Sequence, residues 1–348
     1  MSPQRTQPPG RLSKALAAGL AVLTGALACA DATDVELLQI RGSGVLFGQA
    51  FVDLDGDGLL GAQDPPMADV DVLLVTSTSA RVVQLTTTDE NGAFSLFEVP
   101  VGTYLLSIDA SALGDTLEMF GSGDPISVQL GDTSQVNLGA TYPTRTIEEI
   151  LTAPVGTTVF TSGIALNSRN NADPAGQVHF SGETAYLRAL NVERSGVATG
   201  DSVRLLGRVV SDNGRPAIDQ VTPTVLVRGA ALPIPVETTV AAASTADGGA
   251  LDAALVRIRT VEIADTATAA DGNFHFWAVD GADSVEVVLR SFLGFDTTDF
   301  GPGVARLAQG TGLLSPVDDG AGIVRWRLLP RAGSDMVVEP ALAAVQPR

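Results

Sequence analysis

The sequence has few of the side chains on which most catalytic and metal-binding sites depend. Among 348 residues there are one cysteine and two histidines, which excludes disulfides within the chain and cysteine-based zinc sites. Lys14 is the only lysine, and aromatic residues make up 5% of the chain. No Gly-x-Ser-x-Gly, His-Glu-x-x-His or P-loop motif is present. We therefore predict that this protein is not an enzyme.

Positive charge is also scarce, and this holds for both halves of the chain. Residues 29–144 contain 2 arginines against 17 acidic residues, a net charge of −15. Residues 145–348 contain 16 arginines against 23 acidic residues, a net charge of −7. Proteins bind nucleic-acid phosphates largely through clustered lysine and arginine, so we do not expect nucleic acid as a partner.

The N-terminal residues 1–28 have the composition of a secretory signal. Three basic residues, Arg5, Arg11 and Lys14, precede an apolar run at residues 15–28. This run is too short to span a bilayer as a stable helix, and small residues follow it, as at a signal cleavage site. We predict that the protein is exported and that residues 1–28 are removed.

Cys29 ends this segment in the tetrapeptide ALAC at residues 26–29. The tetrapeptide resembles the lipobox of bacterial lipoproteins, which implies that Cys29 is lipidated and becomes the new N-terminus. Acylation would also explain a lone thiol in an exported protein; ordinary cleavage after residue 30 is the alternative. Because no aspartate directly follows the cysteine, the resemblance implies an outer-membrane or cell-surface lipoprotein, and otherwise a secreted protein. Residues 29–41 would form a tether.

Residues 42–141 contain several short runs in which apolar and polar side chains alternate. Val45, Phe47 and Phe51 belong to the first of these runs, and such alternation predicts strands with one buried face. The Asn-Gly pair at residues 91–92 predicts a β-hairpin turn between two later runs. About seven short strands separated by turns predict a β-sandwich.

A loop rich in aspartate separates the first two predicted strands. Residues 53–64 match an EF-hand-type calcium loop, with carboxylates at positions 1, 3, 5 and 12 and a glycine at position 6. The predicted ligands are Asp53, Asp55, Asp57, Asp64 and, through its backbone carbonyl, Leu59. Calcium prefers oxygen ligands, and a cation would cancel the repulsion among close carboxylates. An acidic turn without an ion is the alternative.

Two stretches of this module carry a family resemblance: GQAFVDLDGDGLLGAQDPPMADVDVLLV and TTDENGAFSLFEVPVGTYLLSID. They resemble the SdrD B-like repeat of surface adhesins, which is related to Cna B-type prealbumin-like domains. The resemblance covers nearly all of residues 42–141 and implies a prealbumin-like sandwich that acts as a spacer, with calcium stiffening the loop. Some Cna B-type relatives contain a Lys–Asn isopeptide cross-link. This module cannot form that bond because it has no lysine.

The second half contains two similar segments, residues 145–222 and 236–340. Each opens with a short helical pattern and continues with about five strand patterns, which predicts a five-stranded barrel with an accessory helix. The pattern resembles the tandem OB-fold domains of secreted bacterial proteins. Three prolines mark residues 223–235 as a linker between the barrels. Residues 341–348 form a tail after the second barrel.

OB folds often bind oligonucleotides or sugars on the face formed by their second and third strands. The candidate stacking residues there are Phe180 and Tyr186 in the first segment, and Phe276 and Trp277 in the second. Because no groove of lysine and arginine accompanies these rings, we favour the alternative that they fill the barrel cores. His179 and His275 hold matching positions, and we expect them on equivalent strands of two separate barrels, far apart.

These features predict an all-β protein: one prealbumin-like β-sandwich followed by two five-stranded OB-like barrels with short accessory helices. The predicted function is that of a non-catalytic cell-envelope lipoprotein, in which a calcium-stabilised sandwich is the spacer that displays two binding barrels. The expected partners are the membrane, reached through the lipid anchor, and an extracellular protein or glycan. The alternatives are a nucleic-acid-binding accessory protein of a secreted nuclease system and a purely structural surface spacer.

Overall fold

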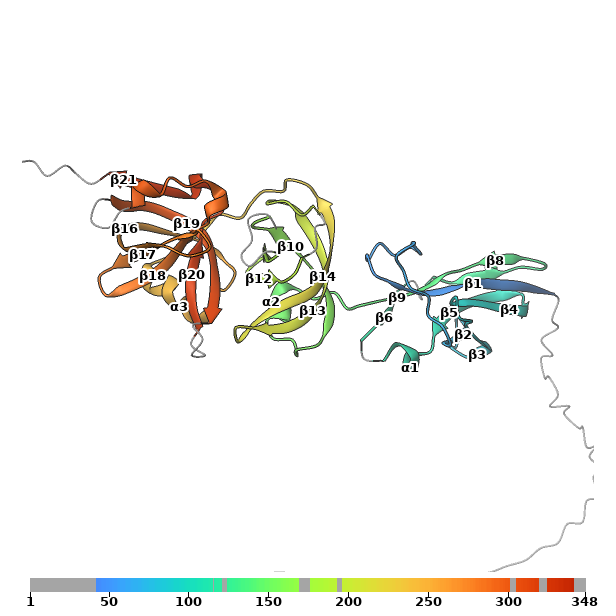
Figure 1. Ribbon diagram of the computed structural model, residues 1–348. Helices are drawn as coiled ribbons and strands as arrows, with labels where there is room; N and C mark the ends of the chain where they lie inside the picture. The colour runs from blue at the N-terminus through green and yellow to red at the C-terminus, as the bar shows by residue number, and fades with distance from the viewer. Residues whose placement is uncertain are drawn as a thin grey trace, which may run out of the picture. The chain divides into compact units, whose positions relative to one another are not determined.

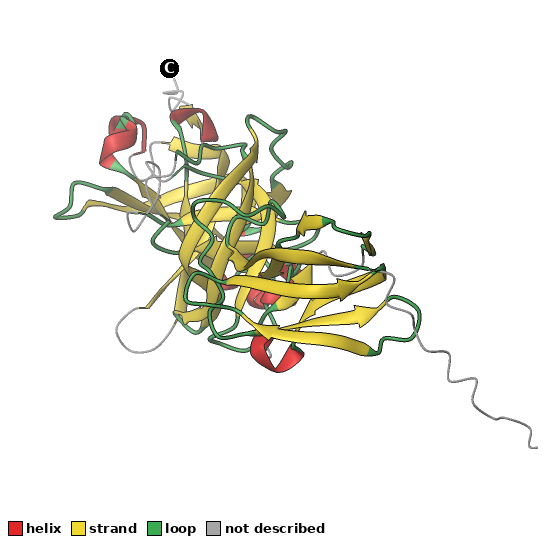
Figure 2. Cartoon of the chain, turned by 90° about the vertical axis from the view of Figure 1, so that its right-hand side faces the viewer, coloured by secondary structure: helices red, strands yellow, loops and turns green. Residues whose placement is uncertain are grey.

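The structure is a computed structural model that describes most of the chain after residue 41. The described residues are 42–114, 116–120, 124–168, 176–192, 196–300, 305–318 and 324–340. The predicted signal, tether and C-terminal tail, and with them Cys29, lie outside the described residues. Strands and loops dominate the described part (Figure 2), as the alternating sequence patterns predict.

Helices are few and short in the described part of the chain. The α-helices are α1 (Ala110–Leu113), α2 (Ile147–Ile150) and α3 (Val240–Thr245), and the 3-10 helices are η2 (Asp247–Gly249), η3 (Ser291–Leu293), η4 (Thr297–Phe300) and η5 (Gly333–Asp335). Helix α2 begins with a capping box, in which the side chains of Thr146 and Glu149 each accept a hydrogen bond from the other's backbone N–H. None of the described helices is long and apolar enough to cross a membrane.

The first module, residues 42–141, is a β-sandwich (Figure 1). Its strands are β1 (Ser43–Asp53), β2 (Asp71–Thr76), β3 (Val82–Thr87), β4 (Ala93–Pro100), β5 (Gly102–Ile108), β6 (Glu118–Phe120), β7 (Ile126–Val128), β8 (Thr133–Gln135) and β9 (Leu138–Thr141). One sheet has the order β4-β1-β9-β6, with β8 also paired to β1, and the other has the order β3-β2-β5-β7. Apolar side chains from both sheets, among them Leu46, Val72 and Leu138, form one buried core. The predicted sandwich is confirmed.

Two local predictions for this module are wrong. In β1 the face that packs on the core carries Leu46 and Ala50; of the three residues named from the sequence Phe51 is buried, but Phe47 is 36% exposed. The Asn-Gly pair at residues 91–92 does not close a hairpin, because β3 pairs with β2 and β4 pairs with β1. The turn instead carries the chain from one sheet to the other. Gly92 has a φ of 73°, and a Cβ there would lie 2.4 Å from the Ala50 carbonyl oxygen.

The second module is a closed five-stranded barrel. Its strands are β10 (Thr158–Ala165), β11 (Val178–Ser181), β12 (Tyr186–Ala189), β13 (Ser202–Asp212) and β14 (Arg215–Val227). They close in the order β10-β11-β12-β14-β13, in which only the β12–β14 pairing is parallel. Ile147 and Ile150 of α2 belong to the barrel's buried core. The accessory helix therefore buries its apolar side against the barrel.

The third module repeats this topology. Its strands are β15 (Val236–Glu237), β16 (Leu255–Thr268), β17 (Phe274–Asp280), β18 (Asp283–Leu289), β19 (Ala305–Asp318), β20 (Val324–Leu329) and β21 (Met336–Pro340). The order β16-β17-β18-β20-β19 is closed by the β16–β19 pairing, and β18 runs parallel to β20. Val240 and Ala243 of α3 join the core. The internal repeat seen in the sequence is therefore a repeat of one barrel.

The two barrels share a buried interface. Apolar residues from both barrels form a separate cluster there, consisting of Leu166, Leu255, Val288, Leu313 and Leu329. Arg188 of β12 is 1% exposed and forms ion pairs with Asp212 in its own barrel and Asp252 in the other. Buried charges are stable only when they are paired and hydrogen-bonded, so this network holds the barrels together.

The predicted linker at residues 223–235 is partly wrong, because β14 continues to Val227. Pro223 lies within the strand, where its residue pairs with Leu205 of β13. Among the described residues, the other edge of β14 meets β12 only at Ile218. A proline, which lacks the N–H donor, is tolerated in a strand where one edge is unpaired.

Candidate functional site

The aspartate-rich loop at residues 53–64 leaves the end of β1 and leads toward β2. Asp53, the last residue of β1, is 2% exposed. Its carboxylate accepts hydrogen bonds from the backbone N–H groups of Gly56 (2.6 Å) and Gly58 (2.9 Å). These glycines have φ values of 71° and 79°, which glycine adopts without steric cost. The loop therefore wraps around the Asp53 carboxylate.

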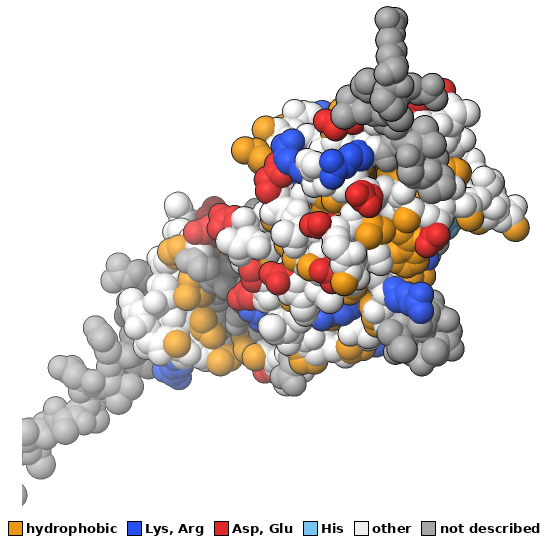
Figure 3. Space-filling model, turned by 90° about the vertical axis from the view of Figure 1, so that its left-hand side faces the viewer, with side chains coloured by type: hydrophobic (Ala, Val, Ile, Leu, Met, Phe, Trp, Pro, Cys, Tyr) orange, Lys and Arg blue, Asp and Glu red, His pale blue; other side chains and the backbone are white. Residues whose placement is uncertain are grey.

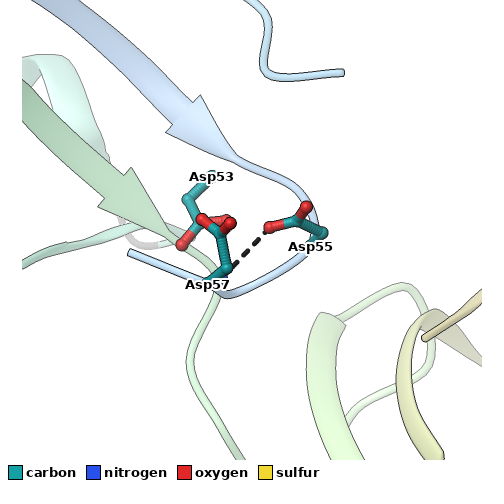
Figure 4. A group of neighbouring side chains, drawn as sticks. All are labelled: Asp53, Asp55 and Asp57. Atoms are coloured by element: carbon teal, nitrogen blue, oxygen red, sulfur yellow. Dashed lines mark hydrogen bonds between the residues drawn. The ribbon is translucent and has the colours of Figure 1, made fainter. Parts of the chain in front are cut away.

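Three carboxylates converge in this loop (Figure 4). One oxygen each of Asp53, Asp55 and Asp57 lies within 4.8 Å of the others. The Asp55 carboxylate accepts from the Asp57 N–H (3.1 Å), and the Asp57 carboxylate accepts from the Leu59 N–H (2.7 Å). Partial burial raises the pKa of Asp55, and the charges of neighbouring aspartates raise it further, against the opposing hydrogen bond from Asp57. Like charges held so close destabilise the loop on its own.

The other two predicted ligands lie in the same loop but outside this group. Asp64 is 9% exposed, and its carboxylate accepts from the backbone N–H groups of Leu54 (3.0 Å) and Gly61 (2.7 Å). It closes the loop by hydrogen bonds and is not one of the three converging carboxylates. Leu59 is 69% exposed; because a leucine side chain has no oxygen, a ligand role for this residue would rest on its backbone carbonyl.

The converging donors suit a hard divalent cation. Calcium–oxygen distances are about 2.3–2.6 Å, so two ligands on opposite sides of one ion stand about 5 Å apart. The three carboxylate oxygens are within 4.8 Å of one another, which lets a single ion contact all of them. Carboxylates are also the ligand type that calcium prefers.

Arg204 of β13 reaches the same loop from the first barrel. Its Nη1 donates to the backbone carbonyl oxygens of Asp55 (3.0 Å) and Gly56 (2.5 Å). Because the guanidinium bonds carbonyls, the carboxylate oxygens keep their capacity to bind a cation. Arg204 could not be identified from the sequence, since it lies 149 positions from Asp55 and no local pattern links the two.

Most of the predicted stacking aromatics lie inside the protein. Phe180 and Phe276 are fully buried in the two barrel cores, as the alternative favoured from the sequence predicts, so their rings cannot stack on a ligand. Tyr186 packs against the second barrel's core and the interface cluster, and burial raises the pKa of its hydroxyl. Trp277 lies on the outer side of β17, between the buried Phe276 and Ala278, and is partly exposed.

The two histidines lie on equivalent strands, β11 and β17, as expected. His179 also contacts the other barrel, because its Nδ1 lies 3.2 Å from the carbonyl oxygen of Ala253, in the segment before β16. A carbonyl only accepts, so Nδ1 carries the proton. In the second barrel, His275 Nδ1 lies 2.7 Å from Glu286 Oε1. Both histidines therefore have structural hydrogen-bond partners.

Comparison with known proteins gives likenesses to solved structures. No family model matches the chain, and no curated protein matches it. The minor pilin GBS52 of Streptococcus agalactiae is 13% identical, with a TM-score of 0.23. The match covers 29% of this chain and 45% of the pilin chain. A candidate carbohydrate-binding protein of Pseudomonas aeruginosa is 19% identical, with a TM-score of 0.20. The match covers 30% of this chain and 92% of that protein's chain.

A further likeness concerns the Ifi202 HINa domain, solved in complex with a 20-bp double-stranded DNA. It has 10% identity and a TM-score of 0.25 over 52% of this chain and 94% of its own. At such identities and TM-scores, these likenesses assign neither a family nor a function.

Proposed function

We propose that this protein is a non-catalytic component of the bacterial cell envelope. The β-sandwich is a spacer, stiffened by a calcium ion that Asp53, Asp55 and Asp57 hold, with the Leu59 carbonyl as a further ligand and Asp64 closing the loop. The two barrels form the binding part and take an extracellular ligand. Cys29 carries the lipid anchor that keeps the protein at the outer membrane or cell surface.

The convergence of three carboxylates on one short loop is the observation that carries this proposal. Their oxygens lie within 4.8 Å of one another, and Asp53 is almost fully buried. Repulsion at such distances is costly near a protein surface, and a divalent cation removes it. A stiffened loop at the end of β1 suits a module that holds other modules away from a membrane.

The charge distribution argues against the nucleic-acid alternative. The second half has a net charge of −7, from 16 arginines and 23 acidic residues. On the face of the molecule in Figure 3, arginines lie in small groups among acidic side chains. Phosphate backbones are bound by continuous basic surfaces, so an extracellular protein or glycan fits the barrels better.

The calcium site is tested by scanning calorimetry of the mature protein in calcium and in EDTA. An ion that binds only the folded state adds RT ln(1 + [L]/Kd), about 1.4 kcal/mol at a tenfold excess over Kd. We expect calcium to raise the melting temperature of the sandwich by several degrees. Magnesium should do less, because it requires octahedral geometry and retains its waters.

Two variants, one in the loop and one a control, show whether the effect of calcium comes from this loop. Asp57→Asn removes one converging charge but keeps an oxygen that can accept from the Leu59 N–H. It should lose the response to calcium and melt no lower than the wild type in EDTA. Glu90→Gln removes an exposed charge from the same module and should respond like the wild type. Identical wild-type melting curves in calcium and EDTA would show that the loop is only an acidic turn.

A further inference from the structure

A cleft of about 440 Å³ opens between the two barrels. Its polar wall is built from Gln177, Asn191, Asp212 and Asn213 of the first barrel and from Ser315 and Arg327 of the second. Gln177 directly precedes β11, Asn191 follows β12, and Ser315 and Arg327 face each other in register on β19 and β20. A volume of this size is within the range of small-molecule sites, which often lie between domains.

Hydrogen bonds from Arg188 Nε and Arg331 Nη1 link the two barrels next to the cleft. The Arg188 Nε donates to Asp252 Oδ1 (3.1 Å), and its Nη2 donates to the Asp212 carbonyl (3.2 Å). Arg331 Nη1 of the second barrel donates to the Leu166 carbonyl of the first (3.0 Å). Together with the apolar interface cluster, these bonds fix both walls. A site whose walls are already in place loses less entropy when a ligand binds.

Gln177 lines the cleft and carries a buried side-chain donor that has no partner in the described part of the chain. Its side chain is 3% exposed, and its Nε2 has no hydrogen-bond partner among the described residues. Buried polar groups in folded proteins nearly always have partners, and an amide lining a cleft can obtain one from a ligand oxygen. The polar wall adds further amide and hydroxyl groups at Asn191, Asn213 and Ser315.

The charges of the lining are balanced, which decides the kind of ligand. Asp212 is paired with Arg188 and accepts from Asn213 Nδ2 (3.2 Å). Arg327 Nε lies 3.9 Å from Glu286 Oε2. A ligand that enters therefore meets no net charge. Four apolar residues complete the lining, Leu190, Pro316, Val317 and Leu329. Amides, a hydroxyl and apolar surface together match a molecule that carries hydroxyls and C–H faces.

We propose that this cleft binds a neutral, hydroxyl-rich ligand, namely one or two sugar units of an extracellular glycan. Gln177 Nε2 donates to a sugar oxygen, Asn213 and Asn191 contact further hydroxyls, and the apolar residues cover a C–H face. The inference deepens the proposed function, since it names the ligand class of the barrels. It is independent of calcium, so the sandwich experiment and the cleft experiment can fail separately.

The test uses the mature protein and a panel of neutral sugars: glucose, galactose, mannose, N-acetylglucosamine, maltose and cellobiose. Binding is measured by saturation-transfer NMR and titration calorimetry up to about 10 mM of each sugar, above a Kd on the order of 1 mM. We expect saturable binding of at least one neutral sugar. Sialic acid and a single-stranded oligonucleotide should not compete for the site.

Matched variants locate the binding. Gln177→Leu keeps the volume of the side chain but removes the amide, and should weaken binding at least tenfold. Gln129→Leu makes the same change at an exposed position of the sandwich and should have no effect. Asn213 has a φ of 50°, so Asn213→Gly deletes its side chain without backbone strain and should weaken binding several-fold. If Gln177→Leu does not fold, sugar binding by Asn213→Gly tests the proposal alone.

The proposal is overturned by any of three results. In the first, no neutral sugar of the panel binds. In the second, Asn213→Gly and a folded Gln177→Leu bind the sugar as tightly as the wild type does. In the third, the anionic sugar or the oligonucleotide binds in the cleft and displaces the neutral sugars, which would make the ligand class wrong.

Discussion

Lowering the pH from 7 to 5 is expected to destabilise the barrels through His179. Its side chain is 1% exposed at the contact between the barrels. Burial, together with the positive charges of Arg188 and Arg290, lowers the pKa of His179 from 6.5 to about 3. At pH 5 the ring is therefore neutral in the folded protein. In the unfolded chain, where its pKa is about 6.5, the same ring is protonated.

The size of the effect follows from this difference. The folded protein binds fewer protons than the unfolded chain, so stability is complete above about pH 7 and is lost as the pH falls from 6.5 toward 3. Each pH unit inside this window costs about 1.4 kcal/mol. Between pH 7 and pH 5 the free energy of unfolding should fall by about 2 kcal/mol, a large share of the stability of an ordinary domain.

Urea unfolding of the mature protein at both pH values measures this loss. The two tryptophans, Trp277 and Trp326, both belong to the second barrel, whereas His179 belongs to the first. A shift of the tryptophan fluorescence transition therefore also reports that the barrels unfold together. His179→Gln removes the titrating ring and keeps an N–H donor for the Ala253 carbonyl, so it should lose about 2 kcal/mol less than the wild type.

Comparison with His179→Gln is needed because other groups titrate as well. The Glu148 carboxylate accepts hydrogen bonds from Thr184, which help to lower its pKa to about 2, so its contribution to stability is lost only below about pH 4.5. Such contributions are the same in both proteins and cancel. If the wild type and His179→Gln lose equal stability between pH 7 and pH 5, the His179 ring is not held neutral in the folded protein.

Two further predictions concern the barrel interface and the anchor. Arg188→Met leaves Asp252 buried without its nearest partner, and should lower the free energy of unfolding by about 3–5 kcal/mol; the same change at the exposed Arg208 should cost no more than about 0.5 kcal/mol in urea unfolding. Cys29→Ser should release the protein from membranes, and mass spectrometry of the mature N-terminus should find an acylated Cys29 in the wild type. A free N-terminus at Asp31 would contradict the lipid anchor.

Much of the candidate calcium site could be predicted from the sequence because its parts are local. Asp53, Asp55 and Asp57 are spaced two residues apart, and a turn that contains Gly56 and Gly58 must bring them close together. The strands were predictable for the same kind of reason, since alternation along the chain reflects the period of an extended backbone. The role of Asp64 was harder to predict, because its carboxylate could bind either an ion or the loop's own N–H groups.

Predictions failed where a residue's surroundings come from distant parts of the chain. Phe47 alternates with its neighbours as a buried residue would, yet the opposite face of β1 meets the core, and alternation alone cannot say which face is inward. The Asn-Gly pair at residues 91–92 marks a turn correctly. Whether that turn joins two strands of one sheet or of two depends on pairing partners that local sequence does not identify.

The many strands, the repeated barrel and the aspartate loop can be predicted from local sequence, because periodicity and short-range turn chemistry are properties of neighbouring residues. The barrel interface and its cleft depend on how distant segments pack. Arg188 and Asp252 are 64 positions apart and would be ordinary charged residues on separate barrels. They become a buried ion pair, and Gln177 a cleft-lining amide, only because the barrels pack together and exclude water from the surfaces that meet.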